Sequence, residues 1–356
     1  MARHTLSAFL VSAAAATRVL AQDAQSTFPA TPLVSLHFPT PSDAPEQADP
    51  GNLARGNQAG YNRCNSTTEG SDSMCQTGFV NSLSDFCVWG PSTPNSTIAD
   101  TEGEEVAWCT LPGHGTRIMP EGTITGAQLV KTSNYVMITG LIQQTNINIA
   151  DGDFGGELDP GGQDLRGNPI GGLMYSTAFN SSAYQVNKWV NFMGSNSFCI
   201  RICNPSGSNP EGFCQHTLDR IGSAYNCPSK YTVGSGMQAG EFEICDSEDM
   251  DIPGVYTQDG QTLSYSQPPE SLGEITSIPY SPRVPASSNC ATTSSAALFA
   301  SATASASASA SGSGGATASR SSGAATASQT GSGAAHVGAS VLTAALGVGL
   351  SVALMA

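Results

Sequence analysis

The sequence predicts a mainly β domain, a sandwich or jelly-roll-like pair of antiparallel sheets with long disulfide-tied loops, followed by a disordered C-terminal stalk. Short runs of β-branched residues with partial period-two alternation fill residues 116–149, and Gly122, Gly126 and Gly140 separate them. The 356 residues include 39 Gly and 21 Pro, which favour turns over long helices. Ten cysteines, an even number, add a disulfide framework to this prediction.

Individual elements follow from these patterns. Strands are predicted at 123–125, 127–130, 135–139 and 145–149, and a further strand at 241–245. One helix is predicted at 184–193, because Val186, Trp189, Val190 and Met193 recur along one helical face.

The N-terminal end reads as a secretory signal peptide over residues 1–21. Basic Arg3 and His4 precede an apolar run, and small or apolar residues stand before a cleavage point after Ala21. The alternative is a buried N-terminal helix. Residues 22–57 follow as a Pro-rich extended arm, laid over the core through apolar residues at 33–38 or forming an edge strand there.

The disulfide-rich β domain is expected at 58–290, and the segments after it have a different composition. Residues 291–335 are Ala, Ser, Thr and Gly apart from Leu298, Phe299, Arg320 and Gln329, which predicts a disordered stalk. Residues 336–356 are apolar and uncharged and predict a GPI-attachment signal, with Gly323 and Ser332 as candidate attachment sites. A retained single-pass helix is the alternative.

The charge balance excludes nucleic acid as a partner, since 13 basic residues stand against 28 acidic ones for a net charge of −15. Only 12% of the residues are charged. All the acidic residues lie between 22 and 290, which predicts a strongly acidic domain on a neutral tether.

The cysteines predict five disulfides in an oxidising compartment, because no Cys-x-x-Cys pair suggests zinc. They form a group of four and a group of six, whose connectivity the sequence leaves open: Cys64, Cys75, Cys87, Cys109, and Cys199, Cys203, Cys214, Cys227, Cys245, Cys290. Asn65, Asn95 and Asn180 each begin an N-glycosylation sequon.

Two acidic stretches are candidate chemical sites. One stretch resembles part of a calcium-binding loop: Asp151, Asp153, Glu157 and Asp159. Calcium is the one cofactor that the sequence suggests, although a solvated Gly/Asp turn explains the pattern as well. Glu241, Glu243 and Glu248 are weak catalytic candidates. On a strand, Glu241 and Glu243 would share one face, as the carboxyl pairs of glycosidases do, whereas the alternative is a solvated acidic loop.

Other polar and aromatic residues suggest weaker sites. His114, Thr116 and Arg117 would suit an anion or a sugar, or simply form a loop that leads into a strand. Trp89, Trp108 and Trp189 would stack on sugars if they were exposed.

Several motifs resemble the fungal secreted proteins called macrophage-activating glycoproteins. They include 72–82, 85–91, 108–110, 122–124, 155–160 and Pro253-Gly254-Val255-Tyr256, and the resemblance spans roughly residues 60–260. It implies a cell-surface or secreted fungal glycoprotein with a GPI signal and supplies no reaction.

We therefore expect an extracellular, GPI-anchored glycoprotein of the outer membrane face or cell wall, with a structural or interaction role. Its partners would be the lipid anchor in the outer leaflet and wall polysaccharide or a host-cell surface. The alternatives are a carbohydrate-binding module and a wall-glucan glycosidase, so the sequence leaves enzymatic activity undecided.

Overall fold

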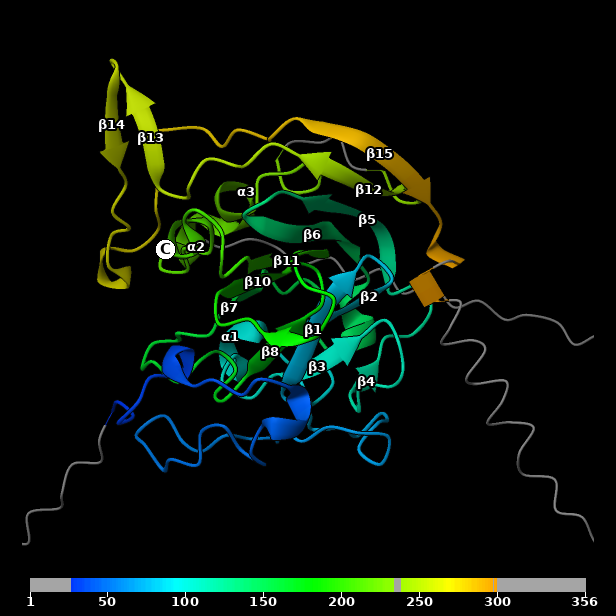
Figure 1. Ribbon diagram of the computed structural model, residues 1–356. Coiled ribbons are helices and arrows are strands. Elements are labelled where there is room, and N and C mark those ends of the chain that lie inside the picture. Colours follow the sequence, from blue (N-terminus) through cyan, green and yellow to red (C-terminus); the bar gives the residue numbers. More distant parts are fainter. Residues whose placement is uncertain (1–26, 234–237, 297, 300–356) are drawn as a thin grey trace, which may run out of the picture. The chain divides into compact units, whose positions relative to one another are not determined.

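The computed structural model describes residues 27–233, 238–296 and 298–299, and within this part the chain folds as a mainly β sandwich (Figure 1). The strands are β1 Thr77–Ser82, β2 Asp85–Gly90, β3 Val106–Cys109, β4 Arg117–Ile118, β5 Ile124–Lys131, β6 Tyr135–Ile142, β7 Gly156–Leu158, β8 Leu173–Ser176, β9 Tyr184–Gln185, β10 Trp189–Gly194, β11 Ser197–Cys203, β12 Phe242–Ser247, β13 Val255–Gln258, β14 Gln261–Ser264 and β15 Ser287–Thr293. The helices are short: α1 Ile98–Thr101, α2 Pro210–Phe213, α3 Gly222–Asn226, and the 3₁₀ turns η1 Leu33–Ser35, η2 Pro41–Asp43, η3 Gln144–Ile147, η4 Asp219–Ile221 and η5 Glu270–Leu272.

Two large sheets form the sandwich. One has the strand order β4-β3-β2-β1-β8-β9 and the other β15-β12-β5-β6-β11-β10-β7, while β13 and β14 form a separate hairpin. Most neighbours are antiparallel, but β1 with β8, β3 with β4, and β12 with β5 are parallel. The predicted mainly β class is confirmed, with mixed rather than purely antiparallel sheets.

The core between the sheets contains aromatic pairs contributed by both layers. The rings of Trp89 and Trp189 lie 5.7 Å apart, and those of Phe86 and Phe198 are stacked at 5.7 Å. The Trp89 backbone N–H donates to Oδ1 of buried Asn191 at 2.9 Å, which ties β2 to β10. Packing and one buried polar contact therefore set how the two sheets meet.

The inner strands β6, β11 and β10 of the seven-stranded sheet are buried on both faces, whereas the edge strand β15 is exposed. Along β11, Phe198, Ile200 and Ile202 enter the core between the sheets, whereas Cys199 and Cys203 enter a second cluster beneath the loops of 204–252. Successive side chains of a strand point to opposite faces, so both faces of this strand are buried, with Arg201 between the two cysteines. This second cluster explains why the alternation in the sequence is only partial.

The helix predicted at 184–193 is wrong, because the structure has β9 and β10 there. The pairing of β10 with β11 continues from Trp189 opposite Ile202 to Gly194 opposite Ser197. In a strand buried on both faces, apolar residues follow no period of two, and here their spacing coincides with that of a helix.

Three of the predicted strands also differ from the structure. The runs at 123–125 and 127–130 belong to the single strand β5, in which Gly126 stands at an irregularity in the pairing with β6. A Cβ on Gly140, which pairs with Ala127, would lie 2.3 Å from the Gly126 oxygen. Gly140 therefore allows a close backbone approach within β6 and does not end a strand. Residues 144–147 form η3 instead of a strand, and Asn148 follows in a left-handed conformation.

The strand predicted at 241–245 is confirmed as β12, and all ten cysteines form disulfides. The pairs stay within the two predicted groups: Cys64–Cys75, Cys87–Cys109, Cys199–Cys227, Cys203–Cys214 and Cys245–Cys290. Two of them start on β11 and hold the segments that contain α2 and α3 over the second cluster.

The described part of the Pro-rich segment packs against the sandwich. Leu33 is buried, its N–H donates to the Leu165 oxygen at 2.9 Å, and no strand forms in this segment. Buried Arg166 donates from Nε to Asp49 Oδ2 at 2.8 Å. Because both ions are buried, removing one of them would leave the other charge buried and unpaired, so the pair is costly to break.

The ordered domain extends past residue 290. β15 continues to Thr293, and Leu298 and Phe299 are buried in the core between the sheets. The stalk predicted from 291 therefore has its first residues inside the domain, because its two large apolar side chains find a place in the core. The signal peptide, most of the stalk and the predicted GPI signal lie outside the described residues.

Candidate functional site

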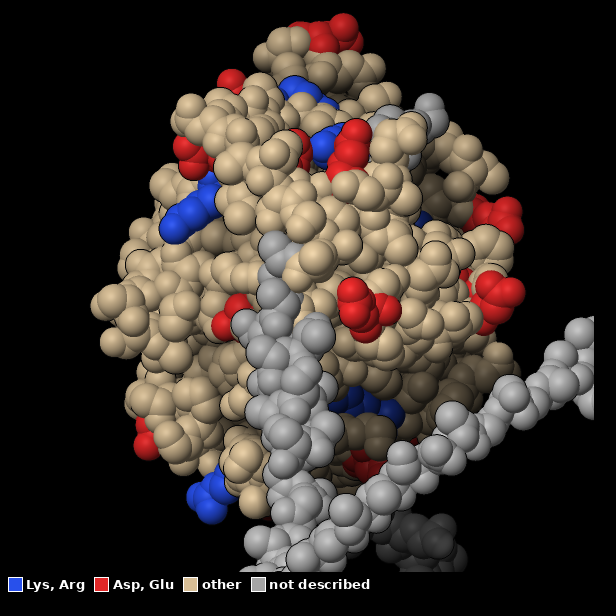
Figure 2. All heavy atoms as spheres, turned by 90° about the vertical axis from the view of Figure 1, so that its right-hand side faces the viewer, with Lys and Arg blue, Asp and Glu red and all other residues tan. Residues whose placement is uncertain are grey.

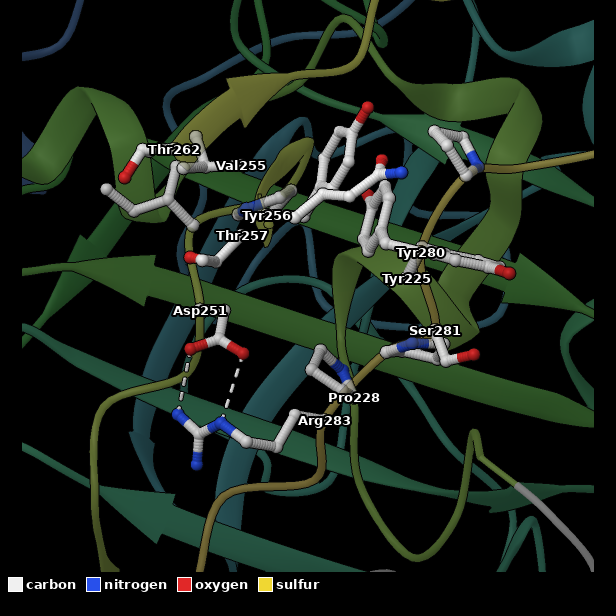
Figure 3. Close-up of a pocket in the computed structure, with 15 residues that line it drawn as sticks. Tyr225, Pro228, Asp251, Val255, Tyr256, Thr257, Thr262, Tyr280, Ser281 and Arg283 are labelled. Carbon is white, nitrogen blue, oxygen red and sulfur yellow. Dashed lines mark hydrogen bonds and ion pairs between the residues drawn. The ribbon is translucent and has the colours of Figure 1, made fainter. Parts of the chain in front are cut away.

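A cleft of about 610 Å³ lies where the β13–β14 hairpin meets the segments around 251–253 and 279–283. We call it the tyrosine cleft (Figure 3). Its lining combines aromatic rings, prolines and short polar side chains: Tyr225, Pro228, Asp251, Ile252, Pro253, Val255, Tyr256, Thr257, Gln258, Thr262, Pro279, Tyr280, Ser281, Pro282 and Arg283.

The aromatic wall is organised around Tyr280. The ring of Tyr256 is stacked on it, with centroids 5.1 Å apart and planes 8° from parallel, and Tyr225 meets it edge-on at 5.3 Å. The Gly254 N–H donates to the Tyr280 hydroxyl at 3.0 Å and fixes its position. Burial raises the pKa of Tyr280, so the hydroxyl stays protonated at neutral pH.

The hairpin that carries Tyr256 has a clear local cause. Gln258 pairs with Gln261, and the two turn residues Asp259 and Gly260 both have positive φ, 51° and 76°. Asp-Gly is a preferred sequence for such a two-residue turn, because its twist matches that of the strands. The turn therefore fixes the register that places Tyr256 against Tyr280.

An exposed ion pair lies away from the tyrosines in the same cleft, as Figure 3 shows. Arg283 donates from Nε to Asp251 Oδ2 at 3.0 Å and from Nη2 to Asp251 Oδ1 at 2.9 Å. The hydrogen bond to Asp251 raises the pKa of Arg283. The faces of the tyrosine rings can pack against C–H groups, and the hydroxyl, amide and charged groups beside them can form hydrogen bonds. This combination suits a ligand with an apolar face and many hydroxyls, such as a sugar.

The catalytic candidates lie elsewhere, on and after β12. Lys230 Nζ binds Glu243 Oε1 at 2.6 Å and Glu241 Oε2 at 3.4 Å, so the two carboxylates do share a face. Glu248 is exposed and lies 3.6 Å from Arg283. Glu241 and Glu243 do not line the tyrosine cleft, and both carboxylates pair with the single ammonium of Lys230.

The calcium candidates are not brought together. Asp151 is exposed, Asp153 accepts the Ile98 N–H at 2.9 Å, and Glu157 and Asp159 are buried. Among the described residues, only Glu243, Cys245 and Cys290 form a group of three metal-ligand types at cation spacing, and both of these sulfurs are in a disulfide.

The weaker candidates are held by contacts within the fold. His114 Nε2 lies 2.6 Å from Asp85 Oδ1 and its ring stacks on Phe79, while buried Arg117 donates to the backbone oxygens of Ser73 and Ser92. The tryptophans do not stack on sugars as hypothesised, because they are buried: Trp89, Trp108 and Trp189.

The predicted modification sites differ in what the structure says of them. The three sequon asparagines are exposed: Asn65, Asn95 and Asn180. The candidate GPI sites Gly323 and Ser332 lie outside the described residues, and within those residues no helix is long and apolar enough to cross a membrane.

Comparison with known proteins identifies relatives in the fungus Mycosarcoma maydis. The chain is 41% identical over 241 residues to "Appressorium protein ROW1", which covers 67% of this chain and 52% of ROW1. It is 39% identical over 221 residues to "Appressorium protein ROW2", which covers 61% of this chain and 72% of ROW2. This chain belongs to the ROW1/ROW2 family of fungal appressorium proteins.

The chain spans about half the length of ROW1. No protein-family model matches this ROW-family chain, and no solved structure matches it. The family established is that of the appressorium proteins, and the resemblance to macrophage-activating glycoproteins stays a prediction.

The sequence reading of this ROW-family protein missed most of the tyrosine cleft. Of the three tyrosines that line it, only Tyr256 belongs to a motif noted in the sequence, at the end of 253–256. A usable signal was the recurrence of tyrosine with proline in 253–282, since that segment also contains Tyr265 and Tyr280. Tyr225 comes from α3, and nothing in the local pattern connects it with the hairpin.

Proposed function

We propose that this chain is a glycosylated fungal cell-surface protein, held by a GPI anchor, whose domain binds wall polysaccharide through the tyrosine cleft. The observation that carries the binding role is the open cleft in which Tyr280 organises the rings of Tyr225 and Tyr256. The printed names of its relatives, appressorium proteins, support a place at the fungal surface. The resemblance to macrophage-activating glycoproteins adds a host-cell surface as a further setting.

Glycosylation is proposed at Asn65, Asn95 and Asn180, where exposure leaves room for a glycan. Figure 2 supports the need for it, because charged groups are scattered sparsely over the face that it shows. Glycans would supply hydration on such a surface. The anchor proposal depends on the composition of 336–356, and release of surface protein by phosphatidylinositol-specific phospholipase tests it; resistance to the phospholipase would contradict it.

The binding role is tested with the purified full chain on insoluble β-glucan and chitin. Replacing a central interface aromatic by alanine commonly costs more than about 1.4 kcal/mol, so Tyr256→Ala and Tyr280→Ala should each weaken binding about tenfold or more. The matched control is Phe154→Ala, since Phe154 is 90% exposed and outside the tyrosine cleft. Equal binding by all variants would contradict the proposed role.

A further inference from the structure

A second cleft, of about 440 Å³, opens beside β7 and has a predominantly acidic lining. We call it the acidic cleft and define it by Glu102, Glu157, Asp159, His216, Asp219 and Glu270. Arg220 also lines it, but its guanidinium donates to the backbone oxygens of Pro268 and Gly273. Five carboxyl groups therefore face one histidine and an arginine already engaged elsewhere.

The floor of this cleft holds a carboxyl group without a partner. Glu157 is 6% exposed, and neither of its oxygens has a hydrogen-bond partner in the described structure. Gly155 fixes the approach of this segment, because a Cβ there would lie 1.5 Å from the Met193 oxygen and its φ is +88°. A buried polar group that lacks a hydrogen bond costs free energy, so it needs another compensation.

Neighbouring charges supply that compensation only in part, because buried Arg201 opposes the like charges around Glu157. Asp159 accepts from the Gly161 and Gly162 N–H groups at 2.6 and 2.9 Å and pairs with His216 Nδ1 at 2.9 Å. The hydrogen bond to Asp159 raises the pKa of His216. Glu157 faces the like charges of Asp159 and Asp219, and buried Arg201 on β11 acts on it without a hydrogen bond. The His216–Asp159 pair thus satisfies one carboxylate and leaves the other open.

We infer that the acidic cleft binds a ligand that carries an ammonium group together with hydroxyls, namely an amino sugar. An ammonium would give Glu157 the charge-assisted hydrogen bond that it lacks. The exposed carboxylates of Asp219 and Glu270 would accept from hydroxyls, whereas the side-chain oxygens of Gln163 and Asn168 already accept from Arg55. A bare cation fits less well, because the cleft carboxylates do not converge at cation spacing among the described residues.

We expect the acidic cleft and the tyrosine cleft to bind different ligands, because the tyrosine cleft offers aromatic rings and no excess of negative charge. The volume of the acidic cleft also lies in the range of small-molecule sites, about 300–1,000 Å³. Because burial raises the pKa of Glu157 well above its usual value, this carboxyl keeps its proton to a higher pH in the free cleft than an exposed glutamate does. Binding of an ammonium should release this proton, which is a signature that simple packing would not produce.

Calorimetry with the purified full chain tests the inference, using glucosamine tetramer and its fully N-acetylated counterpart as probes. We expect the free amine to bind, acetylation to abolish binding, and Glu157→Gln to weaken it at least about tenfold, because a hydrogen bond to a charged group is lost. Glu270→Gln, at the exposed rim, should weaken binding without affecting folding, and exposed Glu104→Gln outside the cleft is the control.

Proton release, measured in buffers of different ionisation enthalpy, should accompany binding to the wild type and disappear in Glu157→Gln. Equal binding of both tetramers would overturn the inference, and so would binding that survives both cleft substitutions. Binding of calcium alone would likewise overturn it. Tyr280→Ala should leave amine binding unchanged, so failure of this inference is distinguishable from failure of polysaccharide binding at the tyrosine cleft.

Discussion

The buried carboxyl of Glu157 predicts an unusual dependence of stability on pH. Burial is the largest cause that raises its pKa above 4.5, followed by Asp159 and Asp219. An acid with a raised folded-state pKa keeps its proton in the folded protein after the unfolded chain has released it. Its contribution to stability is therefore complete below about pH 4.5 and falls as pH rises toward the folded-state pKa.

Glu157→Gln removes this titration while keeping shape and burial. One proton held only by the folded state changes the free energy of unfolding by about 1.4 kcal/mol per pH unit. At pH values between the ordinary glutamate pKa and the raised folded-state pKa, the wild type should thus lose up to about 1.4 kcal/mol per pH unit more than the variant. At pH 4 the two proteins should have nearly equal stability, because both side chains are then neutral in both states.

Guanidinium unfolding at four pH values between 4 and 7 measures this difference. Exposed Glu104→Gln is the matched control and should follow the wild type. Glu105→Gln should behave like Glu157→Gln, since burial also raises the pKa of Glu105 well above its usual value. Parallel pH profiles for the wild type and Glu157→Gln would refute the reasoning, because they would mean that Glu157 titrates alike in the folded and unfolded states.

Three further changes test the packing of the domain by denaturant unfolding. Replacing Cys245 and Cys290 by serine opens a 45-residue loop and should cost about 4 kcal/mol by the chain-entropy estimate; an unchanged midpoint would contradict it. Asn191→Leu removes the acceptor of the buried Trp89 N–H and should cost about 1–3 kcal/mol, whereas a neutral result would mean that this contact between the sheets is dispensable. Phe299→Ala should cost about 3–5 kcal/mol, and stability equal to the wild type would place this residue in the stalk after all.

Local physical chemistry made part of the fold readable from the sequence. The runs of β-branched residues predicted β5, β6 and β12, because strand preference acts over a few residues. Gly126 and Gly140 were expected to separate strands but lie inside β5 and β6. The even cysteine count and its two groups predicted five disulfides, but not that Cys199–Cys227 encloses Cys203–Cys214. Spacing leaves such pairings open, since loops of similar length have similar closure entropy.

The candidate sites depended on contacts between distant segments. Glu157 and Asp159 attracted attention as calcium ligands, yet β7 buries one carboxyl and His216, from a loop 57 residues later, binds the other. Glu241 and Glu243 shared a face as expected, but both pair with Lys230. Charge pattern alone does not reveal which carboxylate obtains a partner, because the partner comes from elsewhere in the chain.

By itself the sequence determined the β class, the acidic charge of the central region, the cysteine framework and the ends predicted for secretion and anchoring. These follow from composition and from patterns that act over a few residues. Only the tertiary structure decided that β10 is a strand, that Leu298 and Phe299 belong to the core, and that Tyr225 and Tyr280 share a cleft. The physical reason is that burial on both faces of a sheet, and the approach of side chains distant in the chain, are properties of the packed molecule.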